Sequence, residues 1–238
     1  MKKRIILILI LILLIVLFIC SNKKTIQKFT NTGDDRKQEC LEFKNEYLKK
    51  DFQIFNNFLS KEECERIINE NKDKKFNKST VIDKNTGKHV ISKDRTSENI
   101  FLNFRNDEFL NNIAERISKI TNLPTENFEE FQLVKYDPPT KTKSAQFYKQ
   151  HYDQKDDIEK NKRYKTFFIY LNDVDKGGHT IFPNLDKKVK PEQGKAVLWN
   201  NLFDKSKLRH PCSLHGGTAP EGKDMKWGMN VWIRESKY

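Results

Sequence analysis

The chain has 238 residues, of which 36% are hydrophobic, 11% aromatic and 33% charged. This length suits one domain with a sizeable core, and the composition excludes a disordered chain. A formal net charge of +12 would suit a nucleic-acid ligand, but the lysines are spread through every segment instead of forming one stripe. The charge therefore indicates a solvated lysine-rich surface and argues against nucleic acid as a partner.

The N-terminus carries an unbroken apolar run at residues 5–20, preceded by the basic residues 2–4. Its length lies between a signal-peptide core and a full membrane span, which flanking lysines can extend, so a signal anchor and a cleaved signal peptide are both open. Phe18 and Ile19 occupy positions where cleavage needs small residues, which favours an uncleaved anchor over residues 1–20. We therefore expect a single-pass membrane protein whose remaining chain lies in the lumen of the endoplasmic reticulum or outside the cell.

Four cysteines occur, at positions 20, 40, 64 and 212. An oxidising compartment would permit one disulfide among Cys40, Cys64 and Cys212, and the sequence leaves the pair open. The spacing matches neither a CxxC motif nor a zinc site.

Residues 21–50 are polar and charged without sustained apolar periodicity, which predicts a stalk before a domain at residues 51–238. Ser60 and Glu63 have the spacing of a capping box, so a helix should begin here and pack the face that carries Cys64, Ile67 and Ile68 on the core. A second helix with one apolar stripe is predicted over residues 107–120.

After Pro124 the pattern changes from helical to alternating. Short runs rich in aromatic and β-branched residues predict strands, separated by Gly, Pro, Asn and Asp, at residues 131–136, 164–171, 180–182, 195–199 and 226–234. Many short strands after a helical beginning predict an α+β fold, a β-sandwich or jelly roll with helices packed outside.

One short motif points to a metal. On a strand, His151 and Asp153 would lie on the same face and could bind one ion together. A third ligand would complete the two-histidine, one-carboxylate triad that leaves positions open on non-haem iron. His215, near the end of the strand region, is the best placed; the remaining histidines, His89, His179 and His210, are interpreted as surface or packing residues.

Lys226 begins the last predicted strand. Alternation places Lys226, Gly228, Asn230 and Trp232 on one face of that strand. An inward lysine is costly unless it is paired, so an anionic ligand would explain it, whereas a solvated lysine at a strand end is the alternative.

Taken together, the motifs of residues 131–235 resemble the catalytic domain of prolyl 4-hydroxylases, in that family's order and near its spacing. They are Leu133-Val134-Lys135-Tyr136, Gln146-x-Tyr148-x-x-His151-x-Asp153, Tyr170-Leu171-Asn172-Asp173-Val174, Gly177-Gly178-x-Thr180-x-Phe182-Pro183, Lys190-Pro191-x-x-Gly194-x-Ala196, Ser213-Leu214-His215-Gly216-Gly217, Lys226-Trp227 and Trp232-Ile233-Arg234-Glu235. Upstream, Phe58-Leu59-Ser60-x-Glu62-Glu63-Cys64 and Arg95-Thr96-Ser97 also resemble the family, so the likeness covers nearly everything after the stalk.

The resemblance implies a double-stranded β-helix with a catalytic core over about residues 131–235. It implies that His151, Asp153 and His215 bind Fe(II) and that Lys226 binds the distal carboxylate of 2-oxoglutarate. Tyr136, Tyr170, Thr180 and Trp232 would line the cosubstrate pocket. The implied reaction consumes O2 and 2-oxoglutarate, forms 4-hydroxyproline in a proline-containing polypeptide, releases succinate and CO2, and uses L-ascorbate to restore oxidised iron.

The chain departs from the family's pattern in two places. The family usually has a cysteine and a proline soon after the glycine pair that follows the distal histidine, whereas here Thr218 and Ala219 precede Pro220, which argues against a disulfide there. The interval from His215 to the lysine is about one residue longer than usual, which leaves Lys223 as a rival to Lys226, although the adjoining Trp227 favours Lys226.

Three other functions stay open. One is hydroxylation of another peptidyl residue such as lysine, although lysyl hydroxylases usually present arginine at the anchor position. The second is demethylation of nucleic acid, and the third is a catalytically silent module that binds proline-rich peptides. The oligomeric state is not predicted.

Overall fold

The structure is a computed structural model that describes residues 33–83, 86, 88–154 and 160–238. The predicted anchor at residues 1–20 lies outside the described residues. Among the helices that are described, none has the length and apolar character needed to cross a bilayer. The chain divides into a unit of residues 1–39 and a compact unit of residues 40–238, and every side-chain contact discussed below lies within the second.

All three described α-helices begin in the first half of the chain, and most of the strands follow them. The helices are α2 (Gly33–Lys50), α3 (Lys61–Asn69) and α4 (Glu108–Thr121), with 3-10 turns η1 (Phe104–Asn106), η2 (Thr125–Asn127), η3 (Pro183–Leu185) and η4 (Pro211–Ser213). The strands are β1 (Phe52–Phe55), β2 (Asn77–Lys78), β3 (Thr80–Ile82), β4 (His89–Ile91), β5 (Glu98–Leu102), β6 (Phe131–Tyr136), β7 (Tyr148–His151), β8 (Arg163–Tyr170), β9 (Thr180–Phe182), β10 (Lys187–Val189), β11 (Ala196–Asn200), β12 (His215–Gly217) and β13 (Lys226–Arg234).

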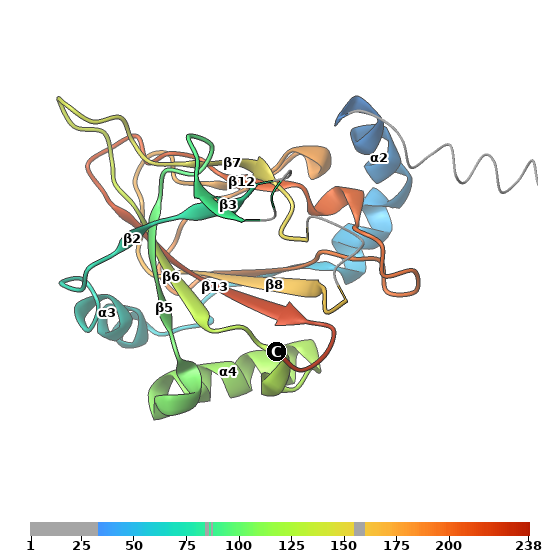
Figure 1. The fold of residues 1–238 in the computed structure, drawn as a ribbon, viewed down its shortest axis with the longest axis horizontal. Coiled ribbons are helices and arrows are strands. Elements are labelled where there is room, and N and C mark those ends of the chain that lie inside the picture. The colour runs from blue at the N-terminus through green and yellow to red at the C-terminus, as the bar shows by residue number, and fades with distance from the viewer. Residues whose placement is uncertain (1–32, 84–85, 87, 155–159) are drawn as a thin grey trace, which may run out of the picture. The chain divides into compact units, whose positions relative to one another are not determined.

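Two antiparallel sheets build a double-stranded β-helix. The larger sheet has the order β1-β11-β8-β13-β6-β5-β2 and the smaller one the order β10-β9-β12-β7, while β3 and β4 form a separate hairpin. Helix α4 covers one face of the larger sheet, and β7 and β12 lie on the opposite side of it (Figure 1). The predicted α+β jelly roll with supporting helices is confirmed for these residues.

Local capping signals fix the two supporting helices. The backbone N–H of Glu63 donates to Ser60 Oγ at 3.2 Å, and the Ser60 N–H donates to the Glu63 carboxylate at 2.8 Å. The predicted capping box is therefore present and begins α3 at Lys61. Asp107 caps α4 by accepting from the Leu110 N–H at 3.0 Å, so the second predicted helix is also confirmed.

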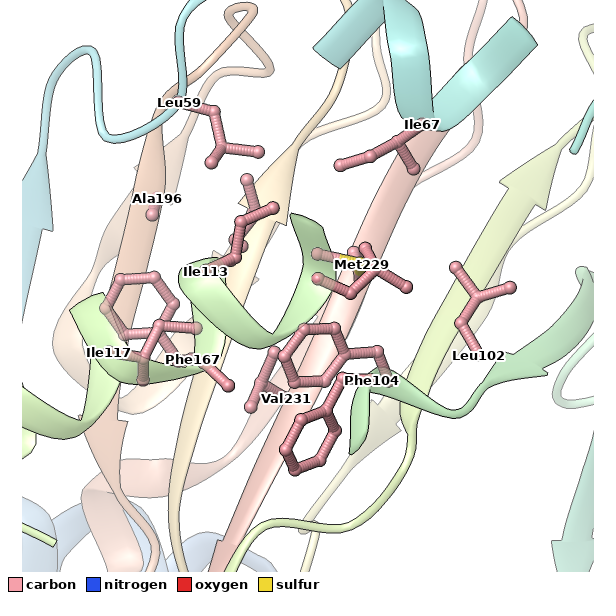
Figure 2. Close-up of a cluster of buried hydrophobic side chains, with 14 of the residues drawn as sticks. Leu59, Ile67, Leu102, Phe104, Ile113, Ile117, Phe167, Ala196, Met229 and Val231 are labelled. Carbon is pink, nitrogen blue, oxygen red and sulfur yellow. The ribbon is translucent and has the colours of Figure 1, made fainter. Parts of the chain in front are cut away.

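The main core lies between these helices and the larger sheet. Ile67 from α3 and Ile113 and Ile117 from α4 are at most 1% exposed, and they pack towards Met229 and Val231 of β13 (Figure 2). Each such side chain contributes roughly 1.5–3 kcal/mol by leaving water. Because alternate residues of β13 fill this core, Lys226 and the other residues of the opposite face point between the two sheets.

The predicted stalk differs from the structure over residues 33–50, which form α2. Cys40 and Tyr47 are both fully buried. Cys40 forms a disulfide with Cys212, and the Tyr47 hydroxyl donates to the Asn200 carbonyl at 2.6 Å. The sequence did not predict this helix because only a few apolar positions of a highly charged segment make contacts, and their partners come from distant parts of the chain.

Candidate active site

Three side chains converge where β7 and β12 meet. His151 ends β7 and pairs with His215, the first residue of β12. Asp153 lies just beyond the end of β7, not within the strand. One donor atom from each of the three residues lies within 4.8 Å of the others. The two Nε2 atoms are each 3.6 Å from an Asp153 carboxylate oxygen, so all three can reach one ion.

Backbone carbonyls set the orientation of both imidazole rings. The Nδ1–H of His151 donates to the Lys149 carbonyl, and that of His215 to the Ser213 carbonyl, both at 2.8 Å. Since a carbonyl oxygen can only accept, the proton is on Nδ1 and the Nε2 lone pair faces Asp153. This arrangement is the one that metal-binding histidines use.

Burial and nearby charges give His151 and Asp153 the protonation states that a metal requires. Burial, and next the nearby His215, lower the pKa of His151 to about 4. Burial alone would raise the pKa of Asp153, but His215, His151 and Arg163 together bring it below its ordinary value. At neutral pH His151 thus offers a neutral imidazole and Asp153 an ionised carboxylate, the forms in which these groups bind Fe(II) in non-haem centres.

Lys226 is buried between the two sheets. It is only 1% exposed, and its Nζ lies 5.0, 5.3 and 5.6 Å from the ring centres of Tyr136, Phe168 and Tyr170. Among the described residues no carboxylate forms an ion pair with it, and burial lowers the pKa of Lys226 to about 7. The rival Lys223 is exposed. A buried ammonium that lies among aromatic rings and has no described carboxylate partner is suited to an anionic ligand.

The predicted cosubstrate residues Tyr136, Tyr170 and Thr180 surround this lysine. The Tyr170 hydroxyl donates to Thr180 Oγ1 at 2.7 Å. Two glycines leave room beside them: a Cβ at Gly217 would stand 3.4 Å from the Tyr136 hydroxyl, and one at Gly178 would stand 3.5 Å from Lys226 Cδ. Gly178 also has a φ of +66°, which side-chain-bearing residues rarely adopt.

Trp232, the remaining predicted residue, lies elsewhere. It is six positions from Lys226 along β13, or about 20 Å at a usual strand rise. There it lines a cavity of about 600 Å³ together with Asp153, Arg95 and Tyr148. The Arg163 guanidinium stacks on its ring at 3.7 Å, and its buried indole Nε1 has no hydrogen-bond partner among the described residues. The structure therefore separates Trp232 from the Lys226 group and places it with Asp153 in the lining of this cavity.

The other histidines lie outside the triad. His210 is buried against Tyr47 and Phe203, while His89 is exposed and His179 half-buried. Sequence reasoning missed Thr166, whose hydroxyl donates to Asp153 Oδ2 at 2.7 Å. The available signal was a polar residue of β8 whose neighbours on the same strand face, Tyr164 and Phe168, are aromatic.

Comparisons with known proteins agree with this geometry. A sequence profile of the 2OG-Fe(II) oxygenase superfamily matches residues 131–234. The chain is 35% identical to prolyl 4-hydroxylase 5 of Arabidopsis thaliana over 208 residues, covering 78% of this chain and 68% of that one. It is 30% identical to a protein of Acanthamoeba polyphaga mimivirus that is named as a prolyl 4-hydroxylase, covering 91% and 90%.

A solved structure supports the same family relationship. The viral collagen prolyl hydroxylase of Paramecium Bursaria Chlorella virus-1, in complex with 2-oxoglutarate, superposes with a TM-score of 0.63 at 27% identity, over 80% of this chain and 99% of that one. The motifs, the triad and these relatives lead to one conclusion: the chain belongs to the 2OG-Fe(II) oxygenase superfamily and, within it, to the prolyl 4-hydroxylase-like dioxygenases.

Proposed function

We propose that the protein hydroxylates proline residues of a polypeptide at C4. The observation that carries the proposal is that one double-stranded β-helix contains both a two-histidine, one-carboxylate triad and a buried lysine whose charge no described carboxylate neutralises. A dicarboxylate that reaches from the metal to Lys226 would bind the metal at one end and neutralise the lysine at the other.

Bound Fe(II) with 2-oxoglutarate and O2 supplies the oxidising power for hydroxylation of a C–H bond, while 2-oxoglutarate becomes succinate and CO2. His151, Asp153 and His215 would hold the metal. Lys226 would pair with the distal carboxylate of 2-oxoglutarate, and Tyr136, Tyr170 and Thr180 would enclose it. The buried position of this pocket excludes water and strengthens the ion pair.

The cavity beside Asp153 is the place for the peptide. Its walls combine aromatic faces from Tyr148 and Trp232 with the guanidinium groups of Arg95 and Arg163. Aromatic-lined grooves suit proline-rich segments, whose preformed extended conformation loses little entropy on binding. Arg95 is fixed there, because it donates to the Gln132 side chain at 2.9 Å and lies 4.5 Å from the Tyr148 ring centre.

The cellular setting forms a second part of the proposal. The apolar run at residues 5–20 and its basic flank support a single-pass anchor, with the catalytic unit in an oxidising lumen such as that of the endoplasmic reticulum or outside the cell. The Cys40–Cys212 disulfide is consistent with such a compartment. The family resemblance supports L-ascorbate as the reductant that sustains turnover.

The test incubates the full-length chain with Fe(II), 2-oxoglutarate, ascorbate and a panel of proline-rich and collagen-like peptides. Succinate and the mass of the peptide are followed together. We expect one hydroxyl added to proline for each succinate formed, and no turnover in His151→Ala. Succinate without peptide hydroxylation would reject this substrate class, and peptide binding without succinate would indicate a silent module.

A further inference from the structure

Asp153 and its neighbour Gln154 are held in position by hydrogen bonds from β8. It lies beyond the end of β7, so no strand pairing holds it. Instead, Thr166 Oγ1 donates to Asp153 Oδ2 at 2.7 Å, and the neighbouring Gln154 accepts from the Arg163 backbone N–H at 2.9 Å. Thr166 and Gln154 are both fully buried, so water does not replace these bonds.

A second buried side chain decides which way the Thr166 hydroxyl points. The Asn201 Nδ2 donates to Thr166 Oγ1 at 2.9 Å. A hydroxyl has a single proton, and because the amide already supplies a hydrogen to its oxygen, that proton is directed to the carboxylate. Asn201 is itself held at both ends of its backbone, since its N–H donates to Tyr164 at 2.7 Å and its carbonyl accepts from His210 at 2.8 Å.

The strand register keeps Thr166 at this place. It lies opposite Trp199 of β11 and Trp232 of β13, in the middle of the larger sheet. Asn201 directly follows β11. The hydrogen-bonded row Asn201–Thr166–Asp153 therefore runs from a rigid sheet to the one triad member that lies outside a strand.

We propose that Thr166 and Asn201 are positioning residues that fix the rotation of the Asp153 carboxylate and so hold it ready to bind the metal through one oxygen. A carboxylate free to rotate could bind with both oxygens and occupy a position that the facial triad has to leave open for cosubstrate and O2. The proposal rests on the assignment of the triad as the metal site, and it adds a residue pair that does not itself touch the metal.

Three threonine variants of the full-length chain test this, with Mn²⁺ as the probe in calorimetric titrations. Thr166→Val keeps the shape and removes the hydroxyl, and Thr166→Ser keeps the hydroxyl. Thr121→Val is the control, because Thr121 is a similarly buried threonine whose hydroxyl donates to the Ile117 carbonyl within α4. We expect Thr166→Val to bind Mn²⁺ about 10–100-fold more weakly, as losses of such supporting groups generally do, and the other two to bind like wild type.

The outcomes separate the possible failures. Wild-type affinity in Thr166→Val would overturn this proposal alone, whereas a wild-type chain that binds no Mn²⁺ would overturn the triad assignment as well. Equal losses in Thr166→Val and Thr166→Ser would also overturn it, since they would show that packing, not the hydroxyl, matters. Thermal unfolding of each metal-free variant identifies any that do not fold. If Thr166→Val does not fold, the Mn²⁺ affinity of Thr166→Ser decides, because a loss there, where the hydroxyl is kept, would contradict the proposal.

A double-variant cycle tests the order of the row. Asn201→Leu removes the amide but leaves the Thr166 hydroxyl, so we expect a smaller loss of Mn²⁺ affinity than in Thr166→Val. If Asn201 acts only through Thr166, the double variant binds as weakly as Thr166→Val and no weaker. Losses that multiply in the double variant would contradict the serial arrangement.

Discussion

At the scale of single residues, Lys226 carries the clearest energetic signature. It is a buried ammonium without a described counter-ion, so metal-free, ligand-free protein bears the cost of its desolvation. We predict that Lys226→Met stabilises the ligand-free protein by a few kcal/mol while weakening 2-oxoglutarate binding by about 100-fold or more. Chemical unfolding and anaerobic titration with 2-oxoglutarate measure the two effects. Lys223→Met, at an exposed position, is the control that should change neither.

The lowered pKa of Lys226 also predicts a pH dependence. Only protonated lysine pairs with a carboxylate, and burial brings the pKa of Lys226 to about 7 in the free protein. Cosubstrate binding should therefore take up a proton above pH 7, and the affinity for 2-oxoglutarate should fall as the pH rises from 7 towards 9. Titrations in buffers of different ionisation enthalpy detect the proton. Arginine stays charged throughout this range, so Lys226→Arg should lose the dependence; if it keeps the same slope, another group is responsible.

The ligand-free protein should respond to pH in the opposite direction. Between the folded pKa of about 7 and the unfolded value of about 10.4, the unfolded chain binds more protons at Lys226 than the folded one. The free energy of unfolding contributed by this residue therefore rises with pH across that window, and its penalty is fully present below pH 7. The difference between wild type and Lys226→Met, measured by urea unfolding at pH 7 and pH 9, should shrink at the higher pH.

At the scale of elements, the Cys40–Cys212 disulfide joins α2 to the turn that precedes His215. The bond links residues 172 positions apart, and Cys212 belongs to η4, whose last residue Ser213 accepts the bond that orients His215. We predict that Cys40→Ser and Cys212→Ser each destabilise the protein by about 2–5 kcal/mol. The double variant should lose no more than either single one, because each already removes the whole bond. Unfolding by urea measures this, and additive losses would contradict the disulfide.

The elements that sequence predicted well are those with local signals. The capping box at Ser60 and the apolar stripe of α4 lie within single segments, as does the alternation that identified β6 and β13. Helix α2 was missed because its buried positions, such as Cys40 and Tyr47, stand in a segment dominated by charged residues and acquire partners only in the folded chain. Local pattern therefore predicts an element only when its own segment contains enough apolar surface.

In the candidate site, too, sequence predicted what local motifs contain and missed what depends on distant parts of the chain. The sequence motif identified His151, Asp153 and His215, but it could not place His215 opposite His151, which depends on pairing between β7 and β12. It also grouped Trp232 with the cosubstrate residues, whereas the length of β13 separates Trp232 from Lys226. Thr166 belongs to β8 and Asn201 directly follows β11, both far from Asp153 in the sequence, so their relation to Asp153 exists only in three dimensions.

At the scale of the whole molecule, metal, cosubstrate and fold should be thermodynamically linked. The triad joins β7 to β12 in the smaller sheet, and Lys226 belongs to β13 of the larger one. A ligand that binds only the folded chain adds about 2.7 kcal/mol at a hundredfold excess over its Kd. We predict that Mn²⁺ raises the thermal midpoint, that 2-oxoglutarate raises it further only when Mn²⁺ is present, and that a chelator reverses both. His151→Ala should lose both shifts, whereas Lys226→Met should keep the Mn²⁺ shift and lose that of 2-oxoglutarate. Because 2-oxoglutarate would contact the metal at one end and Lys226 at the other, a full 2-oxoglutarate shift in either variant would show that it binds elsewhere.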